Sequence, residues 1–472
     1  MTAQRCAAQL LCGPAAGRVE EVAARLLAIQ AQDPRGARLT FRSRSAGLSA
    51  ADVDDALARR SVVVSWLNRG TLHLVLAEDY WWLHPLTAPQ VSAGNARRLA
   101  QEGVPPDDAE RGVAAVTAAL TADGPLTRSQ LRERVAAAGV RTEGQALVHV
   151  LLLASIRGLI VRGPVAGREQ AFVLTRDWLG APPPLDRETA LGELARRYLA
   201  GHAPANDRDL AKWAGIGLRE ARAGLARAGA AERPDGLAEL PGQRRAAGAA
   251  LPPPRLLGAF DPLLLGWASR DPVVGPHRQI VTVNGLFRPF ALVAGRAVAT
   301  WGLAGGQVTL APFGPLDAAT RVALEAEAAD VTRFLGLLPG SRHPPAWSRV
   351  KTARTAMMLS IAAMPMKFQV RPYSDRLTGI SPSSSTASSA TDTFATNDTG
   401  RVRPRTVRVP ETCTPSPAGL APSAAKVKFG WLSTSKKSAE RRCLSRRALP
   451  VSSDPAPTVT APVTAPAALT VP

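Results

Sequence analysis

Hydrophobic and polar positions follow helical spacing and then strand spacing, in an order that recurs along the chain. The apolar spacing near the start predicts a helix from Glu20 to Gln32, and a second helix is expected from Pro34. SAADVDDALARR predicts a third helix, capped by Ser49 and with acidic residues in its first turn. SVVVSWLNRGTLHLVL then alternates on both sides of a glycine and predicts a two-stranded ribbon. Helices followed by a hairpin indicate a winged helix.

The same order recurs twice more, which constrains the architecture. In the second segment Thr127 caps a helix, Gln145–Ile156 forms an apolar helix, and LIVRGPVAGREQAFVLT predicts a strand, a turn and a strand. The third segment starts at Glu188, has a helix capped by Asn206 and ends in a weaker strand pattern. Its helix-turn-helix spacing allows a recognition helix at Leu218–Ala228.

From Pro252 to about Pro315, glycine turns separate short alternating strands, and a helix at Ala318–Leu337 closes this module. Asp261 lies in this module, directly before a proline. A buried carboxylate bonded to backbone amides is the commoner explanation for such an acid, and a functional role is the alternative.

The chain changes character after about His343. The last part holds four of the five methionines, most of the lysines and runs rich in serine, threonine and proline. Such a composition cannot bury enough apolar surface to offset chain entropy, so we predict a disordered basic tail. If the tail is genuine, its basic clusters would bind nucleic acid without specificity. The alternative is that an altered reading frame at the end of the gene produced it.

The predicted fold class is mainly α with β. It consists of three tandem winged-helix (helix-turn-helix) domains, a C-terminal β-rich module and a disordered tail. The expected boundaries are 1–100, 101–185 and 186–250 for the winged helices, 251–342 for the β-rich module and 343–472 for the tail.

The formal net charge of +20 favours polyanionic partners, and nucleic acid is the first candidate. The charge is uneven, because 18 lysines and arginines face only 6 acidic residues from Ser348 onward. No run of about 18 apolar residues is present, so we expect no membrane span. A secretion signal is the alternative at the N-terminus, but the amphipathic continuation after Arg18 favours a cytoplasmic protein.

The four cysteines lie at the two ends of the chain without CxxC spacing, which argues against a disulfide framework and against a zinc site. We therefore expect no metal and no cofactor.

Gln30 and Gln32 are two neutral hydrogen-bonding side chains that an enzyme could use for catalysis. Residues two apart on a regular helix do not share a face, so both amides reach one ligand only if the helix ends or unwinds there. Asp33 before Pro34 supplies such a stop, and we interpret Asp33 as a helix cap rather than a base. The alternative is a capped helix junction with solvated amides.

Six basic side chains are candidate DNA contacts, with a solvated surface as the alternative. Arg69 and His73 lie near the turn of the first ribbon, and a lone histidine on a strand is otherwise a structural residue. The others are Arg162 and Arg168 beside the second hairpin, and Arg219 and Arg222 on the expected recognition helix.

Five stretches, taken in order, resemble the AlkZ/YcaQ-type family of winged-helix DNA glycosylases. They are AIQAQDPRGARL, WLNRGTLHLV, DLAKWAGI, GAFDPLLLGW and FRPFALVAGRAVATW, and the likeness covers roughly residues 5–340. The resemblance implies hydrolytic removal of N7-alkylated purines from double-stranded DNA, including the unhooking of interstrand crosslinks. The family's signature of two glutamines flanking one residue falls on Gln30 and Gln32, not on the Gln-x-Asp variant of one branch.

We expect such a monofunctional glycosylase to act as a monomer at the nucleoid. His73 as a general acid is disfavoured, because a cationic leaving group needs no proton. One alternative is a winged-helix transcription regulator without catalysis. The other is a DNA-binding or toxin-sequestering protein that kept the fold and lost the chemistry.

Overall fold

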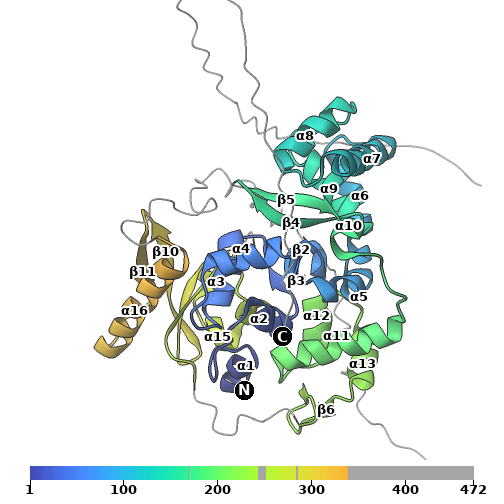
Figure 1. The fold of residues 1–472 in the computed structure, drawn as a ribbon. Helices are drawn as coiled ribbons and strands as arrows, with labels where there is room; N and C mark the ends of the chain where they lie inside the picture. Colours follow the sequence, from blue (N-terminus) through green and yellow to red (C-terminus); the bar gives the residue numbers. More distant parts are fainter. Residues whose placement is uncertain (168, 243–250, 283–284, 338–472) are drawn as a thin grey trace, which may run out of the picture. The chain divides into compact units, whose positions relative to one another are not determined.

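The computed structural model describes residues 1–167, 169–242, 251–282 and 285–337 (Figure 1). Helices dominate these residues, and the sheets they contain are antiparallel, which confirms a mainly α fold with β-structure. Arg168 and the predicted tail at 343–472 lie outside the described residues. In the described part of the chain, no helix combines the length and the apolar character needed to cross a bilayer.

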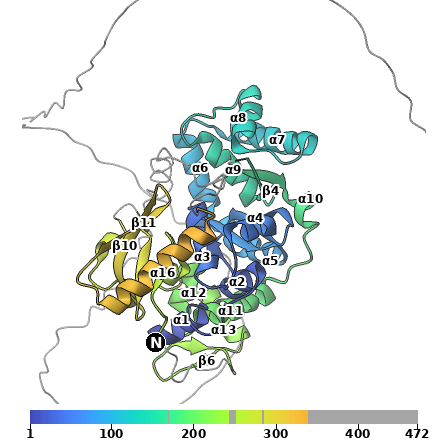
Figure 2. The ribbon, with the colours of Figure 1, turned by 60° about the vertical axis from the view of Figure 1, so that its left-hand side comes forward.

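The first segment runs from helices, labelled α1 to α4 in Figure 2, into a hairpin, labelled β2 and β3 in Figure 1. Its elements are α1 (Thr2–Ala8), α2 (Val19–Leu26), β1 (Ile29–Gln30), α3 (Pro34–Arg42), α4 (Ala50–Ala58), β2 (Val62–Trp66), η1 (Asn68–Gly70) and β3 (Leu72–Leu76). The predicted cap at Ser49 is confirmed, because Asp52 accepts hydrogen bonds from its backbone N–H and its hydroxyl, both at 2.7 Å. The predicted ribbon is the β2–β3 pair.

The predicted helix from Glu20 to Gln32 is wrong in its second half. α2 ends before Leu27, whose φ of 62° cannot continue a right-handed helix. The next residues form the short strand β1, which pairs with β3. Apolar spacing in LLAIQ suits a helix, but backbone hydrogen bonding to a distant strand overrides that local preference.

The second segment contains longer helices and a second hairpin. Its elements are α5 (Ala77–Thr87), η2 (Pro89–Val91), α6 (Ser92–Gln101), α7 (Pro106–Asp123), α8 (Arg128–Ala137), α9 (Ala146–Ile156), β4 (Ile160–Ala166), β5 (Glu169–Leu174) and α10 (Thr175–Leu179). The cap at Thr127 is confirmed as a reciprocal pair with Gln130, and the predicted apolar helix is α9.

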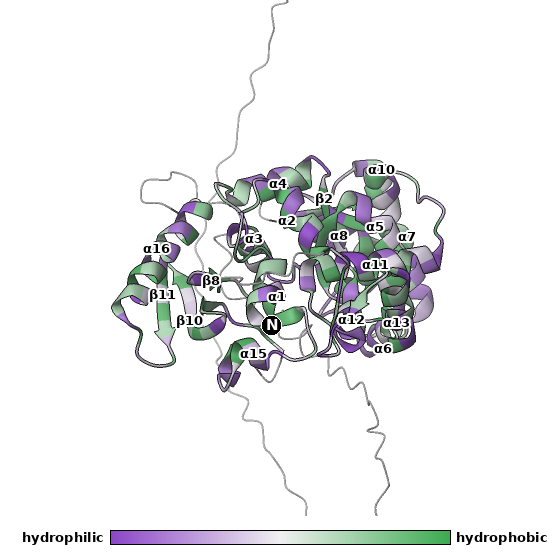
Figure 3. Cartoon of the chain, turned by 90° about the horizontal axis from the view of Figure 1, so that it is seen from below, coloured by the Kyte–Doolittle hydropathy of each residue, from purple (hydrophilic) through white to green (hydrophobic). Residues whose placement is uncertain are grey.

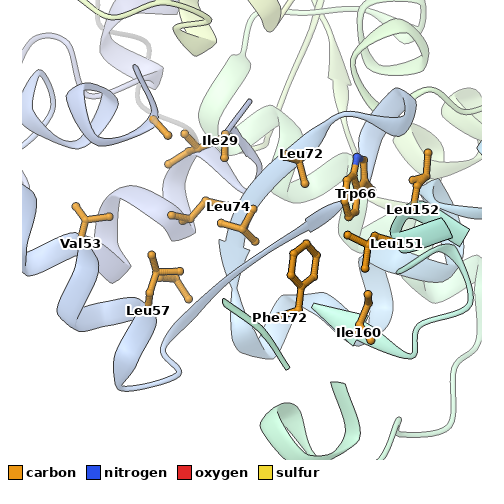
Figure 4. Packing of buried hydrophobic residues seen from close by; sticks show 14 of the residues in the cluster. Ile29, Val53, Leu57, Trp66, Leu72, Leu74, Leu151, Leu152, Ile160 and Phe172 are labelled. Carbon is orange, nitrogen blue, oxygen red and sulfur yellow. The ribbon is translucent and has the colours of Figure 1, made fainter. Parts of the chain in front are cut away.

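The two hairpins form one five-stranded sheet in the order β1-β3-β2-β4-β5. β2 and β4 join them where Val64 pairs with Arg162. Trp66 and Phe172, one from each hairpin, stack with ring centroids 6.5 Å apart in a shared core (Figure 4). The first two segments therefore share a sheet and a core, which the sequence pattern did not indicate.

The third segment repeats the order of helices and hairpin. Its elements are α11 (Arg187–His202), α12 (Asp207–Ala214), α13 (Leu218–Arg227), β6 (Ala231–Glu232) and β7 (Ala238–Glu239). The cap at Asn206 is confirmed, because its side chain accepts a hydrogen bond from the Asp209 N–H at 2.9 Å. Gly201 lies so close to the Arg25 carbonyl that a side chain at this position would collide with it, and α11 therefore packs tightly on the end of α2.

The C-terminal module contains a four-stranded sheet in the order β11-β10-β9-β8. Its elements are β8 (Arg255–Leu257), α14 (Pro262–Leu265), α15 (Asp271–Val274), η3 (Arg278–Ile280), β9 (Phe290–Val293), β10 (Arg296–Ala304), β11 (Gln307–Pro312) and α16 (Ala318–Phe334). The predicted closing helix is α16, three residues shorter than expected. Hydrophilic and hydrophobic residues alternate along α16 in Figure 3, as in a helix with one buried side.

Two buried arginines of the first segment bind carboxylates of the C-terminal module. Arg44 donates to both oxygens of Asp261, at 2.8 and 2.9 Å, and both side chains are fully buried. Asp261 also accepts the Leu263 N–H at 2.9 Å, which confirms the structural interpretation of this acid. Arg42 donates to Glu327 at 2.7 Å. These ion pairs tie α3 and the residues directly after it to the C-terminal module.

We expect Asp261→Ala to lower the free energy of unfolding by about 3–5 kcal/mol, because it leaves the Arg44 charge buried without a carboxylate. Urea denaturation followed by circular dichroism measures the change. The matched control is Asp123→Ala, which removes an ion pair with Arg134 between two exposed side chains. That control should change the stability by less than about 1 kcal/mol, and equal losses in the two variants would contradict the prediction.

Candidate active site

The structure brings the side chains of Gln30 and Gln32 together at the end of β1. Gln30 pairs with His73 of β3, and the ladder continues as the Ala31 N–H donates to the Leu72 carbonyl at 2.7 Å. Residues two apart in an extended chain point to the same face, so a strand achieves what a helix could not. The Gln30 amide donates a hydrogen bond to the side-chain oxygen of Gln32.

One atom of this pair has no hydrogen-bond partner. Gln30 is only 5% exposed, and within the described residues its side-chain oxygen accepts no hydrogen bond. Leaving a buried acceptor unpaired costs free energy, so such an atom calls for a ligand or a water molecule. Gln32 is half-buried. The arrangement offers one free amide oxygen next to a second amide that is open to solvent.

Asp33 acts as the cap of the following helix. Its side chain accepts the Arg35 N–H at 3.0 Å, and Pro34 occupies the first position of α3. This confirms the interpretation of Asp33 as a cap, and it fixes the corner that carries the two glutamines.

His73 lies across the ladder from Gln30 and is 2% exposed. Its Nδ1 donates to the Thr71 carbonyl at 2.9 Å, which leaves Nε2 as the unprotonated nitrogen. Burial and the nearby positive charge of Arg69 lower the pKa of His73 to about 3. The imidazole is therefore neutral at physiological pH and cannot serve as a proton donor there.

Arg69 sits in η1 with a φ of 57° and points its guanidinium at the end of α12. Its Nη1 donates to the carbonyl oxygens of Lys212, at 3.1 Å, and Trp213. Burial, followed by repulsion from Arg270, lowers the pKa of Arg69 to about 10. The structure thus places Arg69 near His73 and makes it a link to the third segment.

The other predicted contacts lie on different elements. Arg162 lies in β4, with its guanidinium carbon 4.9 Å from the ring centroid of Trp66 and 5.0 Å from that of Phe172. Arg219 and Arg222 are exposed on α13, and Arg222 forms an ion pair with Asp207 at 2.7 Å. No hydrogen bond joins these three arginines to the glutamine pair among the residues described.

Two buried polar residues near the glutamines escaped the sequence analysis. Ser65 pairs with His73 on the side opposite Gln30, and its buried hydroxyl interacts with the hydroxyl of Tyr80. Asn68 is fully buried, and neither polar atom of its side chain has a partner within the described chain. The alternation in VVVSW could have revealed Ser65, because it puts this residue on the same face as His73.

Comparisons with known proteins identify the family of the chain. The family model described as DNA glycosylase AlkZ-like matches residues 23–334, a range that includes the glutamine pair. A relative from Streptomyces sahachiroi, named interstrand DNA cross-link repair glycosylase, is 28% identical over 342 residues, which cover 67% of this chain and 91% of the relative. The solved structure of Streptomyces sahachiroi DNA glycosylase AlkZ matches with a TM-score of 0.60 and 26% identity, covering 73% of this chain and 97% of that one. The chain therefore belongs to the AlkZ-like family of DNA glycosylases.

Proposed function

We propose that the protein hydrolyses the N-glycosidic bond of N7-alkylated purines in double-stranded DNA and also unhooks interstrand crosslinks. Gln30 and Gln32 orient the attacking water. The observation that carries the proposal is the buried, unpartnered oxygen of Gln30 in an amide pair held on one face of β1. The Streptomyces sahachiroi relative is named as an interstrand DNA cross-link repair glycosylase, which supports the crosslink part.

The chemistry needs positioning more than a strong base. Alkylation at N7 gives the purine a positive charge, so the purine leaves readily and takes the electrons of the C1′–N9 bond. The sugar becomes oxocarbenium-like, and the water oxygen bonds to C1′ while its proton passes to solvent. Amide oxygens that hold this water also direct negative dipole ends toward the developing charge. An undamaged, neutral guanine leaves far less readily and is spared.

A duplex substrate is compatible with a site that has two amides and no strong base. Many enzymes that act on a base flip it into a pocket. A crosslinked base cannot swing out freely, so the enzyme must reach C1′ with the lesion largely in the duplex. Two amides at an edge strand suit such an approach, since they need to contact a water and a sugar rather than enclose a base.

We also propose that the first three segments are tandem winged helices that contact DNA, with the boundaries expected from the sequence. Their recurring helices and hairpins support this assignment. Arg162, Arg168, Arg219 and Arg222 remain predicted contacts. We propose that the protein acts as a monomer at the nucleoid.

The direct test uses duplex DNA with a single 7-methylguanine, and a second duplex with a nitrogen-mustard crosslink. We expect abasic sites from the first duplex and separated strands from the second. If the wild-type protein releases no base while binding is saturated, the proposed reaction is wrong.

Gln30→Ala and Gln32→Ala should each slow base release by about one to three orders of magnitude, the usual scale for loss of a preorganised polar group. DNA affinity should stay nearly unchanged, because neither side chain is charged. Single-turnover kinetics and fluorescence anisotropy measure the two quantities. Gln101→Ala, on α6, is the matched control and should behave as wild type. Lost binding with intact turnover would reverse the roles we assign.

The rate of base release should vary by less than about twofold between pH 6 and pH 8. His73 stays neutral in this range, because its pKa is lowered to about 3, and the cationic purine needs no proton. Below about pH 6.5, His73 binds a proton in the unfolded chain but stays neutral in the folded protein. The free energy of unfolding therefore decreases as the pH falls, and the rates must be measured on folded protein. An inflection between pH 6 and pH 8 that disappears in His73→Gln would contradict the prediction.

A further inference from the structure

Three basic side chains from three segments come together around the end of α12. Arg69 comes from η1, Lys212 from α12, and Arg270 directly precedes α15. Arg69 donates to the backbone of Lys212, and the Lys212 ammonium donates to the Ala268 carbonyl, two residues before Arg270. The tight packing of Gly215, where an added Cβ would lie 3.0 Å from the Arg69 nitrogen, holds α12 against η1.

All three side chains bond to carbonyl oxygens, and none forms an ion pair within the residues that the structure describes. The acceptors are Lys212 and Trp213 for Arg69, Ala268 at 2.8 Å for Lys212, and Leu264 at 2.9 Å for Arg270. Other buried arginines of the protein behave differently, since Arg42 and Arg44 bind carboxylates. The carbonyls fix the three cations in place and leave their charge without a counter-ion.

Arg69 and Arg270 lie within electrostatic reach of the Lys212 ammonium. After burial, the charges of Arg270 and Arg69 contribute most to the lowered pKa of Lys212, and Asp209 opposes them. That carboxylate is already engaged, because it accepts the Ala268 N–H at 2.8 Å and lies 3.8 Å from Arg5. Like charges at close range destabilise the unliganded protein, so their assembly favours an anion as ligand.

We propose that Arg69, Lys212 and Arg270 form a binding site for one backbone phosphate of the damaged DNA strand. Each side chain is at least partly exposed, and each retains N–H groups that no described residue accepts. Two guanidinium groups and an ammonium match the oxygens and the charge of a phosphodiester.

The site deepens the proposed function and rests on it. Arg69 lies four residues before His73, whose pKa its charge lowers, and His73 pairs with Gln30 across the β1–β3 ladder. Phosphate contacts fix the register of a protein on a duplex without reading its sequence. A phosphate bound at this site would fix the position of the lesion's C1′ relative to the two glutamines. The proposed reaction requires such positioning.

The test pairs protein variants with single phosphate replacements. The probe is a duplex carrying 2′-fluoro-7-methylguanosine, whose glycosidic bond resists hydrolysis, with one phosphate at a time replaced by a neutral methylphosphonate. For the wild type we expect one position next to the lesion where the replacement weakens binding by about three- to tenfold, the scale of losing one charged contact. Lys212→Gln and Arg270→Gln should bind less tightly, lower the salt slope by about 1 and become insensitive to replacement at that position.

Two further variants serve as controls for the loss of charge. Arg270→Lys retains the charge and should recover the salt slope, whereas Arg111→Gln, which removes an exposed ion pair with Asp108 at 2.8 Å, should match the wild type throughout. If folded variants keep the wild-type salt slope, or lose thermal stability alone, the three cations serve only to stabilise the fold and the proposal is overturned. Equal sensitivity to every replacement in wild type and variants also overturns it. Base release from 7-methylguanine DNA is measured separately. Failure of the glycosylase proposal can therefore be distinguished from failure of the phosphate-site proposal.

Discussion

The pairing of β1 with β3 is the constraint on which the active site depends. Two residues of strand lie between a helix that ends at a positive φ and a helix that begins at a proline. In a helix the spacing of Gln30 and Gln32 would separate the amides, whereas in extended chain it places them on one face. The strand also sets Gln30 opposite His73. The amides of Gln30 and Gln32 can therefore reach one ligand only because the backbone is extended at this point.

Local signals in the sequence predicted local structure well. The caps at Asp33, Ser49 and Thr127 and the two large hairpins all form, because a cap needs only neighbouring atoms and a hairpin only a turn. β1 was missed because its stability comes from a partner more than 40 residues away. The pairing of β2 with β4 was missed for the same reason, because the two strands are far apart in the sequence. Arg69 could be placed at a turn, but not against the carbonyls of α12, since no local pattern encodes that approach.

Integration with the C-terminal module explains why the glutamine corner is rigid. α3 starts two residues after Gln32 and carries Arg42 and Arg44 into the module, where they bind buried carboxylates. At Gly36 a Cβ would collide with the Ala259 carbonyl, so even alanine is excluded where the helix crosses this loop. Buried ion pairs add little net stability compared with apolar packing, but they demand one geometry. Here that geometry fixes the direction in which the chain leaves the strand that carries Gln30.

Charge is distributed in a way that suits a cationic substrate. A positive group beside an N7-alkylated purine would repel it and would oppose the positive charge that develops on the sugar. Burial keeps His73 neutral, and the amides of Gln30 and Gln32 carry only dipoles, so these groups of the candidate site are uncharged. The cations that attract DNA are displaced to η1, α12 and the start of α15, where carbonyl oxygens hold them. A protein can bind a polyanion and still stabilise a cationic transition state only if it separates these two demands in space, and here the neutral strand pair and the basic side chains lie on different elements.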